Sequence, residues 1–474
     1  MEQFATTRRG FLKSVGAMAA AAAWPGLLAA GSPRRKPNFV LIFIDDMGYG
    51  DIGPFGSTKN RTPNLDRMAA EGMKLTSFYV AAPVCTPSRA ALMTGCYPKR
   101  VGLAKGPRHA VLLPGDAHGL NADEVTVAEV LKSAGYATAC IGKWHLGDQP
   151  EFLPTRHGFD YYFGLPYSND MWAGHPVKKF NFPPLPLMRG EKAVGRIDTM
   201  ADQSKLTALY TQEAVTFIRD NKDRPFFLYL PHNMMHGPLA PGAAFAGKSA
   251  NGKVGDVIEE LDWSTGEILK TIRELGIEKD TLVFFTSDNG AAAGTAAPLR
   301  GRKGTCFEGG MREPTLAWWP GTIPAGAVCD EIATAMDILP TFAALAGAKQ
   351  PQDRIIDGKG ARDLLTGKGG AKSKYEAFFY YRRESLSAVR SGPWKLHANG
   401  QLYNLDKDIG EKTNVADDNP AVVKRLAGYL EKARADLGDG PDPGPGCRPV
   451  GKAKGPLKYV IPRSENTNDN ELHK

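Results

Sequence analysis

The sequence has few cysteines and no long apolar segment beyond its first thirty residues. Six cysteines occur among 474 residues, and none lies in a CxxC pair or at a Cys/His spacing typical of zinc modules. Their even number permits disulfides in an exported protein, but the long spacings demand none. No later segment approaches the length of a membrane span, so we expect no span in the mature protein.

Runs of like charge and internal repeats are also missing. The formal net charge is +8, but lysines and arginines are scattered along the chain. Scattered basic residues indicate a solvated surface rather than a nucleic-acid groove, so we expect no nucleic-acid partner. With 42% hydrophobic residues, the chain is long enough for a large core and more than one domain.

The N-terminus has the pattern of an export signal. Arg8 and Arg9 precede an alanine-rich apolar stretch that ends in small residues. This order is typical of cleaved signals, and the paired arginines resemble a bacterial twin-arginine signal. We expect residues 1–30 to direct a bacterial protein to the periplasm or out of the cell. An ordinary secretory signal or a short anchor is the alternative.

Strand and helix patterns alternate over residues 35–372. Short apolar runs rich in β-formers indicate strands that are buried on both faces, as in a parallel sheet. These runs are residues 37–45, 136–142, 225–231 and 281–290. Amphipathic helix patterns lie between them, at residues 125–135, 204–221 and 254–276. The alternation predicts an α/β fold with a large mixed, mostly parallel sheet sandwiched by helices.

The pattern changes after about residue 345. Short alternating strands with tight turns occupy residues 376–405, and a helix pattern follows at 420–437. We therefore predict a C-terminal subdomain, residues 373–474, made of a smaller antiparallel sheet packed with a helix. Its tail from about residue 438 is rich in Gly, Pro and Lys, which predicts loose order.

The segment VCTPSRAALMTG, residues 84–95, places a cysteine at the expected start of a helix. Pro87 is favoured in a first turn, and Gly95 suits a left-handed C-cap. Cys85 would then lie among the free N–H groups of a helix N-terminus, with Arg89 leaning back toward it. Both a reactive residue and a buried structural cysteine fit this pattern.

Oxygen-bearing side chains end two of the predicted strands. Asp45 and Asp46 follow the first strand, and Asp288 and Asn289 follow the strand at 281–290. Ligands of open α/β sheets bind beyond the carboxyl ends of strands, so the four could converge on one hard cation. Ca²⁺, or Mg²⁺ as the alternative, suits this set better than Zn²⁺. Singly, each pair could instead begin a turn.

Basic side chains follow the other two predicted strand ends, and another lies in the loop after Asp288. Lys143 and His145 lie two residues apart, so in an extended segment they point the same way. His232 and His236 follow the strand at 225–231, and Lys303 lies in a Gly-rich loop. Singly, lysines are usually solvated, and histidines often pack or cap.

The order of these motifs resembles that of the formylglycine-dependent type I sulfatases of the alkaline phosphatase superfamily. The matching segments are DD, CTPSR, GKWH, a histidine before Gly-Pro, SDNG and GRKGTCFEGG, and the likeness runs from about residue 37 to 414. Their joint occurrence is specific, although CTPSR alone would not be. The resemblance implies an alkaline phosphatase-like fold and an arylsulfatase-like sulfuric ester hydrolase.

The resemblance also implies a chemical role for Cys85. A maturation enzyme that recognises CxPxR would oxidise it to formylglycine, whose hydrate carries two hydroxyls. One hydroxyl would attack sulfur to give a sulfated enzyme. The other hydroxyl would then lose its proton, so that the carbonyl re-forms and sulfate is expelled.

The remaining motif residues take their roles from the same resemblance. The Ca²⁺ ligands would be Asp45, Asp46, Cys85 as its hydrate, Asp288 and Asn289. Arg89 and Lys143 would steady the hydrate, His236 and Lys303 would bind the sulfate ester, and His145 would accept the second hydroxyl's proton. We favour His236 over His232 because Gly237 and Pro238 follow it.

The substrate is the least constrained part of the sequence reading. We expect Ser168, Asn169, Asp170 and His175 to line the substrate pocket, with a purely loop-forming role as the alternative. A sulfated saccharide is the expected substrate, with aryl sulfates as reporters. Two rivals stay open, a phosphonate monoester or phosphodiester hydrolase of the same superfamily and a non-catalytic exported glycan-binding protein.

Overall fold

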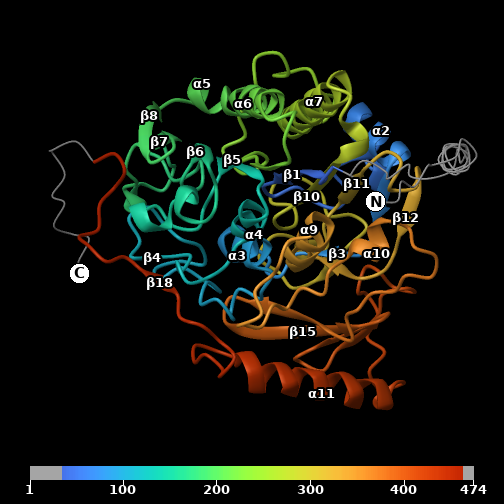
Figure 1. Cartoon of the computed structure of the whole chain (residues 1–474). Helices are drawn as coiled ribbons and strands as arrows, with labels where there is room; N and C mark the ends of the chain where they lie inside the picture. Colours follow the sequence, from blue (N-terminus) through green and yellow to red (C-terminus); the bar gives the residue numbers. More distant parts are fainter. Residues whose placement is uncertain (1–34, 463–474) are drawn as a thin grey trace, which may run out of the picture. The chain divides into compact units, whose positions relative to one another are not determined.

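A ten-stranded mixed sheet runs through residues 35–462, the part of the chain that the computed structural model describes (Figure 1). The signal expected at residues 1–30 lies outside this part. Across the sheet the strands are β12 (Ala327–Cys329), β2 (Met73–Leu75), β11 (Thr315–Trp318), β10 (Thr281–Ser287), β1 (Asn38–Ile44), β9 (Phe226–Pro231), β5 (Ala137–Lys143), β6 (Tyr161–Leu165), β7 (Leu185–Arg189) and β8 (Lys192–Ile197).

The middle of this sheet is parallel, and its outer parts are mixed. β10, β1, β9, β5 and β6 pair in parallel, while β11, β7 and β8 join antiparallel. The four apolar runs in the sequence are therefore the four neighbouring strands β10, β1, β9 and β5. This confirms the predicted α/β class and places four carboxyl strand ends side by side.

Helices cover both faces of the sheet, as Figure 1 shows. One face packs on α2 (Pro63–Glu71), α6 (Leu206–Asp220) and α7 (Gly252–Glu274), and the other on α3 (Cys85–Thr94), α4 (Val127–Ser133) and α9 (Ile338–Ala346). Alternate β1 residues belong to the two cores: Val40 and Ile42 to the first, Phe39 and Leu41 to the second. A strand buried on both sides has no solvent-facing position, which explains the uninterrupted apolar sequence of residues 39–44.

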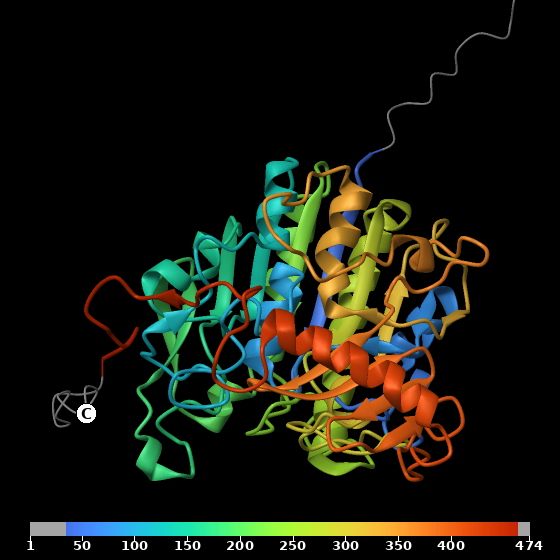
Figure 2. The same ribbon diagram turned by 90° about the horizontal axis from the view of Figure 1, so that it is seen from below.

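The predicted C-terminal sheet is also present. Its four antiparallel strands are β14 (Phe378–Arg382), β15 (Ser385–Ser391), β16 (Trp394–His397) and β17 (Leu402–Asn404). Helix α11 (Pro420–Leu437) packs on β15 and β16, and Figure 2 shows it crossing in front of them. The boundary at residue 373 stays a prediction, because this sheet shares its hydrophobic core with α3, α4 and α9.

Short elements complete the described region. They are α5 (Met200–Gln203), α8 (Glu308–Met311), α10 (Arg362–Leu365), and the strand pairs β3 (Phe78–Tyr79) with β13 (Ala333–Thr334) and β4 (His118–Gly119) with β18 (Gly451–Lys452). β18 and the Arg448–Glu124 ion pair, at 2.7 Å, attach the tail to the main body. These contacts join the tail to the main body, and the loose order predicted for residues 438–462 stays a prediction.

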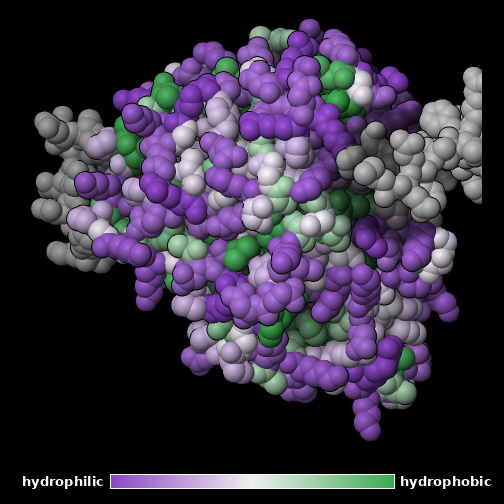
Figure 3. All heavy atoms as spheres, viewed as in Figure 1, coloured by the Kyte–Doolittle hydropathy of each residue, from purple (hydrophilic) through white to green (hydrophobic). Residues whose placement is uncertain are grey.

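The outer surface is mainly hydrophilic. Figure 3 shows hydrophilic residues over most of one face, with smaller hydrophobic areas between them. Among the described residues, no helix combines the length and apolarity needed to cross a bilayer. The six cysteines are all unbridged.

Candidate active site

The acidic residues predicted at two strand ends meet in the structure. β1 and β10 are neighbours in register, so Asp45 and Asp46 emerge beside Asp288 and Asn289. Asp46 adopts φ 61°, a tight turn in which its N–H donates to Asp288 Oδ1 at 3.2 Å. Asn289 Nδ2 donates to Asp46 Oδ1 at 2.7 Å. These contacts hold two sequence-distant pairs in one buried cluster.

Cys85 lies at the first position of α3, directly beside this cluster. Its thiol and one oxygen each of Asp45 and Asp288 lie within 4.8 Å of one another. Gly95 ends the helix at φ 69°, as the sequence predicts. Burial raises the pKa of the Cys85 thiol to about 11, although Lys143 and Lys303 oppose the shift. An unmodified thiol here would stay protonated at neutral pH and be a poor nucleophile.

Arg89 lies under the cluster, one helical turn after Cys85. Its guanidinium is fully buried and donates through Nε and Nη2 to Asp288 Oδ2 at 3.1 and 2.8 Å. Nη1 donates to the Lys143 carbonyl at 2.8 Å. This rigid fork fixes the Asp288 carboxylate and joins α3 to the end of β5.

Lys143 supplies the second buried cation. Its ammonium forms an ion pair with Asp45 Oδ2 and donates to Ser168 Oγ at 3.1 Å. Burial raises the pKa of Asp45, but the charges of Lys143 and Arg89 outweigh it and hold that pKa well below its usual range. Asp45 is therefore ionised and available as a cation ligand.

Unpaired oxygens mark the place where a divalent ion would fit. Asp45 Oδ1 and Asn289 Oδ1 are buried without a hydrogen-bond partner, which is costly unless a ligand supplies one. Burial and the Asp45 charge raise the pKa of Asp288 to about 6, although Arg89 and Lys143 oppose the shift. An all-oxygen donor set of this kind suits Ca²⁺ or Mg²⁺.

A cavity of about 230 Å³ opens above the cluster. The sequence-predicted residues that line it are Cys85, His145, Ser168, Asp170, His175, His236 and Lys303. Arg89, Lys143 and the strand-end residues lie beneath. Asn169 does not reach the cavity, because its side chain donates to Gln203 Oε1 at 3.3 Å and its carbonyl accepts from Gln203 Nε2 at 2.8 Å. Asn169 supports the loop instead.

His145 lines the cavity by a different route from the one expected. The segment does not remain extended: β5 ends at Lys143, and His145 adopts φ 63°. Its Nε2 lies 2.9 Å from the Leu112 carbonyl, which can only accept, so Nδ1 carries a free lone pair. Burial and the Lys143 charge hold the pKa of His145 well below its usual range. The imidazole is a neutral proton acceptor.

His236 and Lys303 close the cavity over Asp46. Lys303 Nζ lies 2.6 Å from Asp46 Oδ1, and His236 Nε2 lies 3.8 Å from Oδ2. His232, the alternative, lies outside the cavity, with its Nε2 3.2 Å from Ser264 Oγ and its pKa lowered to about 3 by burial. This placement favours His236 as the residue that meets substrate.

The cavity also has an apolar side that the sequence reading missed. Phe180 and Phe182 stack with ring centroids 5.2 Å apart, and the His175 ring meets both edge-on. Met171 extends the same wall. The alternating aromatics of HPVKKFNFPP were the available signal, but only the three-dimensional path of the loop shows that they face Cys85.

Comparison with known proteins agrees with this geometry. A family model described as Sulfatase matches residues 37–348, and one described as N-sulphoglucosamine sulphohydrolase, C-terminal, matches residues 302–436. The chain is 45% identical to N-acetylgalactosamine-6-sulfatase of Rattus norvegicus, covering 78% of this chain and 73% of that protein. It is 40% identical to human arylsulfatase A, over 89% and 96% of the two chains. The solved structure of Ps i-CgsB in complex with k-i-k-neocarrahexaose superposes with a TM-score of 0.74 at 31% identity, covering 84% of this chain and 92% of that one.

Proposed function

The chain belongs to the sulfatase family, and from this premise we propose that it is an exported bacterial enzyme that hydrolyses sulfate esters of saccharides through a formylglycine at position 85. The observation that carries the proposal is the convergence of Cys85, Asp45 and Asp288 within 4.8 Å beside the cavity. Aryl sulfates would serve as reporter substrates. The resemblance of residues 1–30 to a twin-arginine signal supports export to the periplasm or beyond.

The position of residue 85 suits a modified side chain better than a thiol. A maturation enzyme would convert Cys85 to an aldehyde, and water would hydrate it. One hydroxyl attacks sulfur while the S–O bond to the saccharide breaks. The second hydroxyl then loses its proton, the carbonyl re-forms, and the bond from carbon to the sulfate oxygen breaks to release sulfate. A serine would lack this exit from the covalent intermediate.

The charged residues around position 85 would have different roles in these steps. Asp45, Asp46, Asp288, Asn289 and residue 85 would hold the divalent cation, which supplies positive charge to the attacking hydroxyl and to a sulfate oxygen. Arg89 and Lys143 lie beneath and steady the hydrate. Lys303 and His236 contact the ester from above, where one of them protonates the leaving oxygen.

His145 is suited to the second step. Its neutral imidazole keeps Nδ1 unprotonated, because Nε2 donates to the Leu112 carbonyl at 2.9 Å. It would take the proton of the second hydroxyl as the carbonyl re-forms. Its low pKa keeps it neutral over the working pH range, and the proton passes on to solvent at each turnover.

The cavity favours a saccharide sulfate as substrate. Phe180 and Phe182 offer flat apolar surface for a sugar ring, while Ser168 and His175 offer polar contacts. Asp170 Oδ1 has no hydrogen-bond partner and would accept one from a sugar hydroxyl. The relative named N-acetylgalactosamine-6-sulfatase and the solved structure in complex with k-i-k-neocarrahexaose support this class.

Two measurements test the proposal together. Peptide mass spectrometry of protein from a host with the maturation enzyme should show formylglycine at position 85, and Cys85→Ala should lower nitrophenyl sulfate hydrolysis by about 10⁴-fold or more. Cys329→Ala, at the edge of the sheet, is the matched control and should retain activity. A plain cysteine in fully active enzyme would refute the mechanism.

A substrate panel separates the rivals. Defined sulfated monosaccharides and disaccharides should be hydrolysed, with nitrophenyl phosphonate esters far slower. Preference for the phosphonate would favour the phosphonate hydrolase, and binding of saccharide sulfates without turnover by formylglycine-containing protein would favour the glycan-binding protein.

A further inference from the structure

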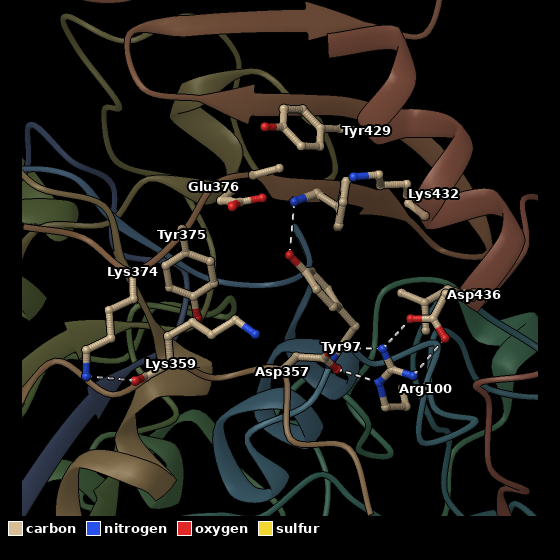
Figure 4. Close-up of a pocket in the computed structure, with 14 residues that line it drawn as sticks. Tyr97, Arg100, Asp357, Lys359, Lys374, Tyr375, Glu376, Tyr429, Lys432 and Asp436 are labelled. Atoms are coloured by element: carbon tan, nitrogen blue, oxygen red, sulfur yellow. Dashed lines mark hydrogen bonds and ion pairs between the residues drawn. The ribbon is translucent and has the colours of Figure 1, made fainter. Parts of the chain in front are cut away.

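A second and larger cavity lies at the other end of α3 from Cys85. It has a volume of about 560 Å³, within the range of small-ligand sites, and Figure 4 shows its lining side chains. Tyr97 and Arg100, just after α3, form one side, and α11 contributes Tyr429 and Lys432. The ten residues of α3 correspond to roughly 15 Å, so a ligand here would not touch the reacting sulfate ester.

Three lysines around this cavity have no carboxylate partner within the described residues. Lys359, Lys374 and Lys432 are all exposed. Lys374 Nζ donates to the Lys359 carbonyl at 3.4 Å, and Lys432 Nζ lies 5.4 Å from the centroid of the Tyr429 ring. Neither contact neutralises an ammonium charge. The three cations are therefore available to an anion.

The acidic residues of the cavity are mostly occupied by Arg100. Asp357 Oδ2 and Asp436 Oδ2 lie 2.7 and 2.6 Å from its guanidinium nitrogens, as the dashed lines in Figure 4 show. Glu376 is the remaining lining carboxylate. With Arg100 included, the lining carries four cations and three carboxylates, a net charge of +1, and its three lysines lie outside the Arg100 ion pairs. This positive excess favours an anionic ligand.

Aromatic rings give the cavity flat surfaces that are fixed in advance. Tyr375, Phe379 and Tyr429 are half-buried. The Tyr375 hydroxyl donates to Asp337 Oδ1 at 2.9 Å, and the Phe379 N–H donates to the Tyr97 hydroxyl at 3.0 Å. The Tyr375 and Tyr97 rings, which these bonds hold, lose little conformational entropy on binding, and the faces of aromatic rings suit the C–H face of a sugar.

We propose that this cavity is a second, non-catalytic binding site for a sulfated saccharide. Its aromatic rings would contact sugar faces, and Lys359, Lys374 and Lys432 would bind sulfate groups. The choice of a saccharide rests in part on the proposed function. A polymeric substrate held here would raise the local concentration of sulfate esters near the catalytic cavity without entering the reaction.

Calorimetric titration of the Cys85→Ala protein tests the site without turnover. The ligand is a sulfated galactan hexasaccharide, compared with the same hexasaccharide after chemical desulfation. We expect two binding events, one at each cavity. Lys432→Glu or Tyr429→Ala should weaken one event at least tenfold, while Lys303→Ala should weaken the other. Lys424→Glu, on the same helix outside the cavity, is the matched control and should retain both.

Each outcome decides between the two sites. Two events that persist in both Lys432→Glu and Tyr429→Ala would overturn the second site, as would equal binding of the desulfated hexasaccharide there. A single event removed by Lys303→Ala would overturn the second site and leave the proposed function standing. A single event removed only by Lys432→Glu would support the second site and contradict the proposed substrate. Nitrophenyl sulfate hydrolysis by Lys432→Glu with Cys85 intact should equal that of the parent.

Discussion

Two buried ionic clusters in this protein are similar in composition and opposite in completeness. The first, here called the open cluster, joins Asp45, Asp46 and Asp288 to Arg89, Lys143 and Lys303. The second, here called the Glu308 cluster, joins Glu308 and Glu411 to Arg312, Arg390 and Lys395. Both place carboxylates and cations out of water. Only the first leaves oxygens unpaired beside a cavity.

The Glu308 cluster satisfies every carboxylate oxygen. Glu308 Oε1 accepts from Tyr380 and Lys395, each at 2.9 Å, and Oε2 accepts from Tyr79 and Arg312. Glu411 Oε2 accepts from the Glu308 N–H at 2.7 Å, and Oε1 lies 2.8 Å from His397 Nε2. Charge burial alone therefore does not identify a ligand site. Incomplete pairing next to open space does.

The largest expected effect is a loss of stability when the Glu308 cluster is disrupted. Glu308→Gln removes one negative charge from among buried cations. Because those cations are then uncompensated, the free energy of unfolding should fall by about 3–5 kcal/mol. Chemical denaturation measures this loss. Glu376→Gln, a change of the same kind at an exposed position, should cost less than about 0.5 kcal/mol. A loss below about 1 kcal/mol in Glu308→Gln would show that the two clusters do not differ in this way.

The open cluster should respond in activity rather than stability. Lys303→Ala should lower kcat/KM for nitrophenyl sulfate by about 10²–10³-fold, because it removes a charge that contacts the ester. Its free energy of unfolding should fall less than in Glu308→Gln, since the Lys303 side chain is partly exposed and Asn289 still donates to Asp46. Arg302→Ala, one residue away, is the control and should keep its activity. Equal losses of activity in the two variants would contradict the assignment.

Removing divalent cations should destabilise the protein through the open cluster. A ligand present at 100 times its dissociation constant contributes about 2.7 kcal/mol, so chelation should lower the unfolding free energy by this order. Ca²⁺ or Mg²⁺ added back should restore it, and their relative potency identifies the preferred ion. Asp288→Asn should reduce the response, whereas Glu308→Gln should retain it. An unchanged unfolding curve after chelation would argue against a cation there.

An effect confined to acid pH separates unpaired atoms in the core from those in a site. Neither ring nitrogen of His157 has a partner, yet the ring packs against Trp144 away from the cavity. Burial lowers the pKa of His157 to about 4. Between about pH 6.5 and pH 4, the histidine is therefore protonated in the unfolded chain but not in the folded protein. Stability should fall with pH down to about 4, by up to about 1.4 kcal/mol per unit.

The variant His157→Phe should remove this contribution and flatten the acid side of the stability curve, measured by denaturation at several pH values. Nitrophenyl sulfate hydrolysis at neutral pH should not change. A loss of activity would place His157 in the catalytic machinery, which its position contradicts.

The sequence predicted those features that depend on local pattern and strand order. The four apolar runs became neighbouring parallel strands, and their ends brought Asp45 and Asp288 together. Helix α3 begins at Cys85 and is capped by Gly95, as the residue types at these positions predict. The left-handed turn at His145 and the inward path of Phe180 were not predictable, because they depend on loop packing. The Glu308 cluster was also missed, since Arg390 and Lys395 come from short strands while Glu308 and Glu411 come from a short helix and a loop, and each alone looks solvated in sequence.

The Glu308 cluster also limits where the chain can be truncated. Glu308 follows Lys303 by five positions, and its partners Tyr380, Arg390 and Lys395 belong to the small sheet. A shortened protein that kept only the large sheet would leave the buried Glu308 with Tyr79 and Arg312 as its partners, five residues after the Lys303 wall of the cavity. Exchanging this end between relatives would therefore amount to active-site engineering, even though none of the exchanged residues touches sulfur.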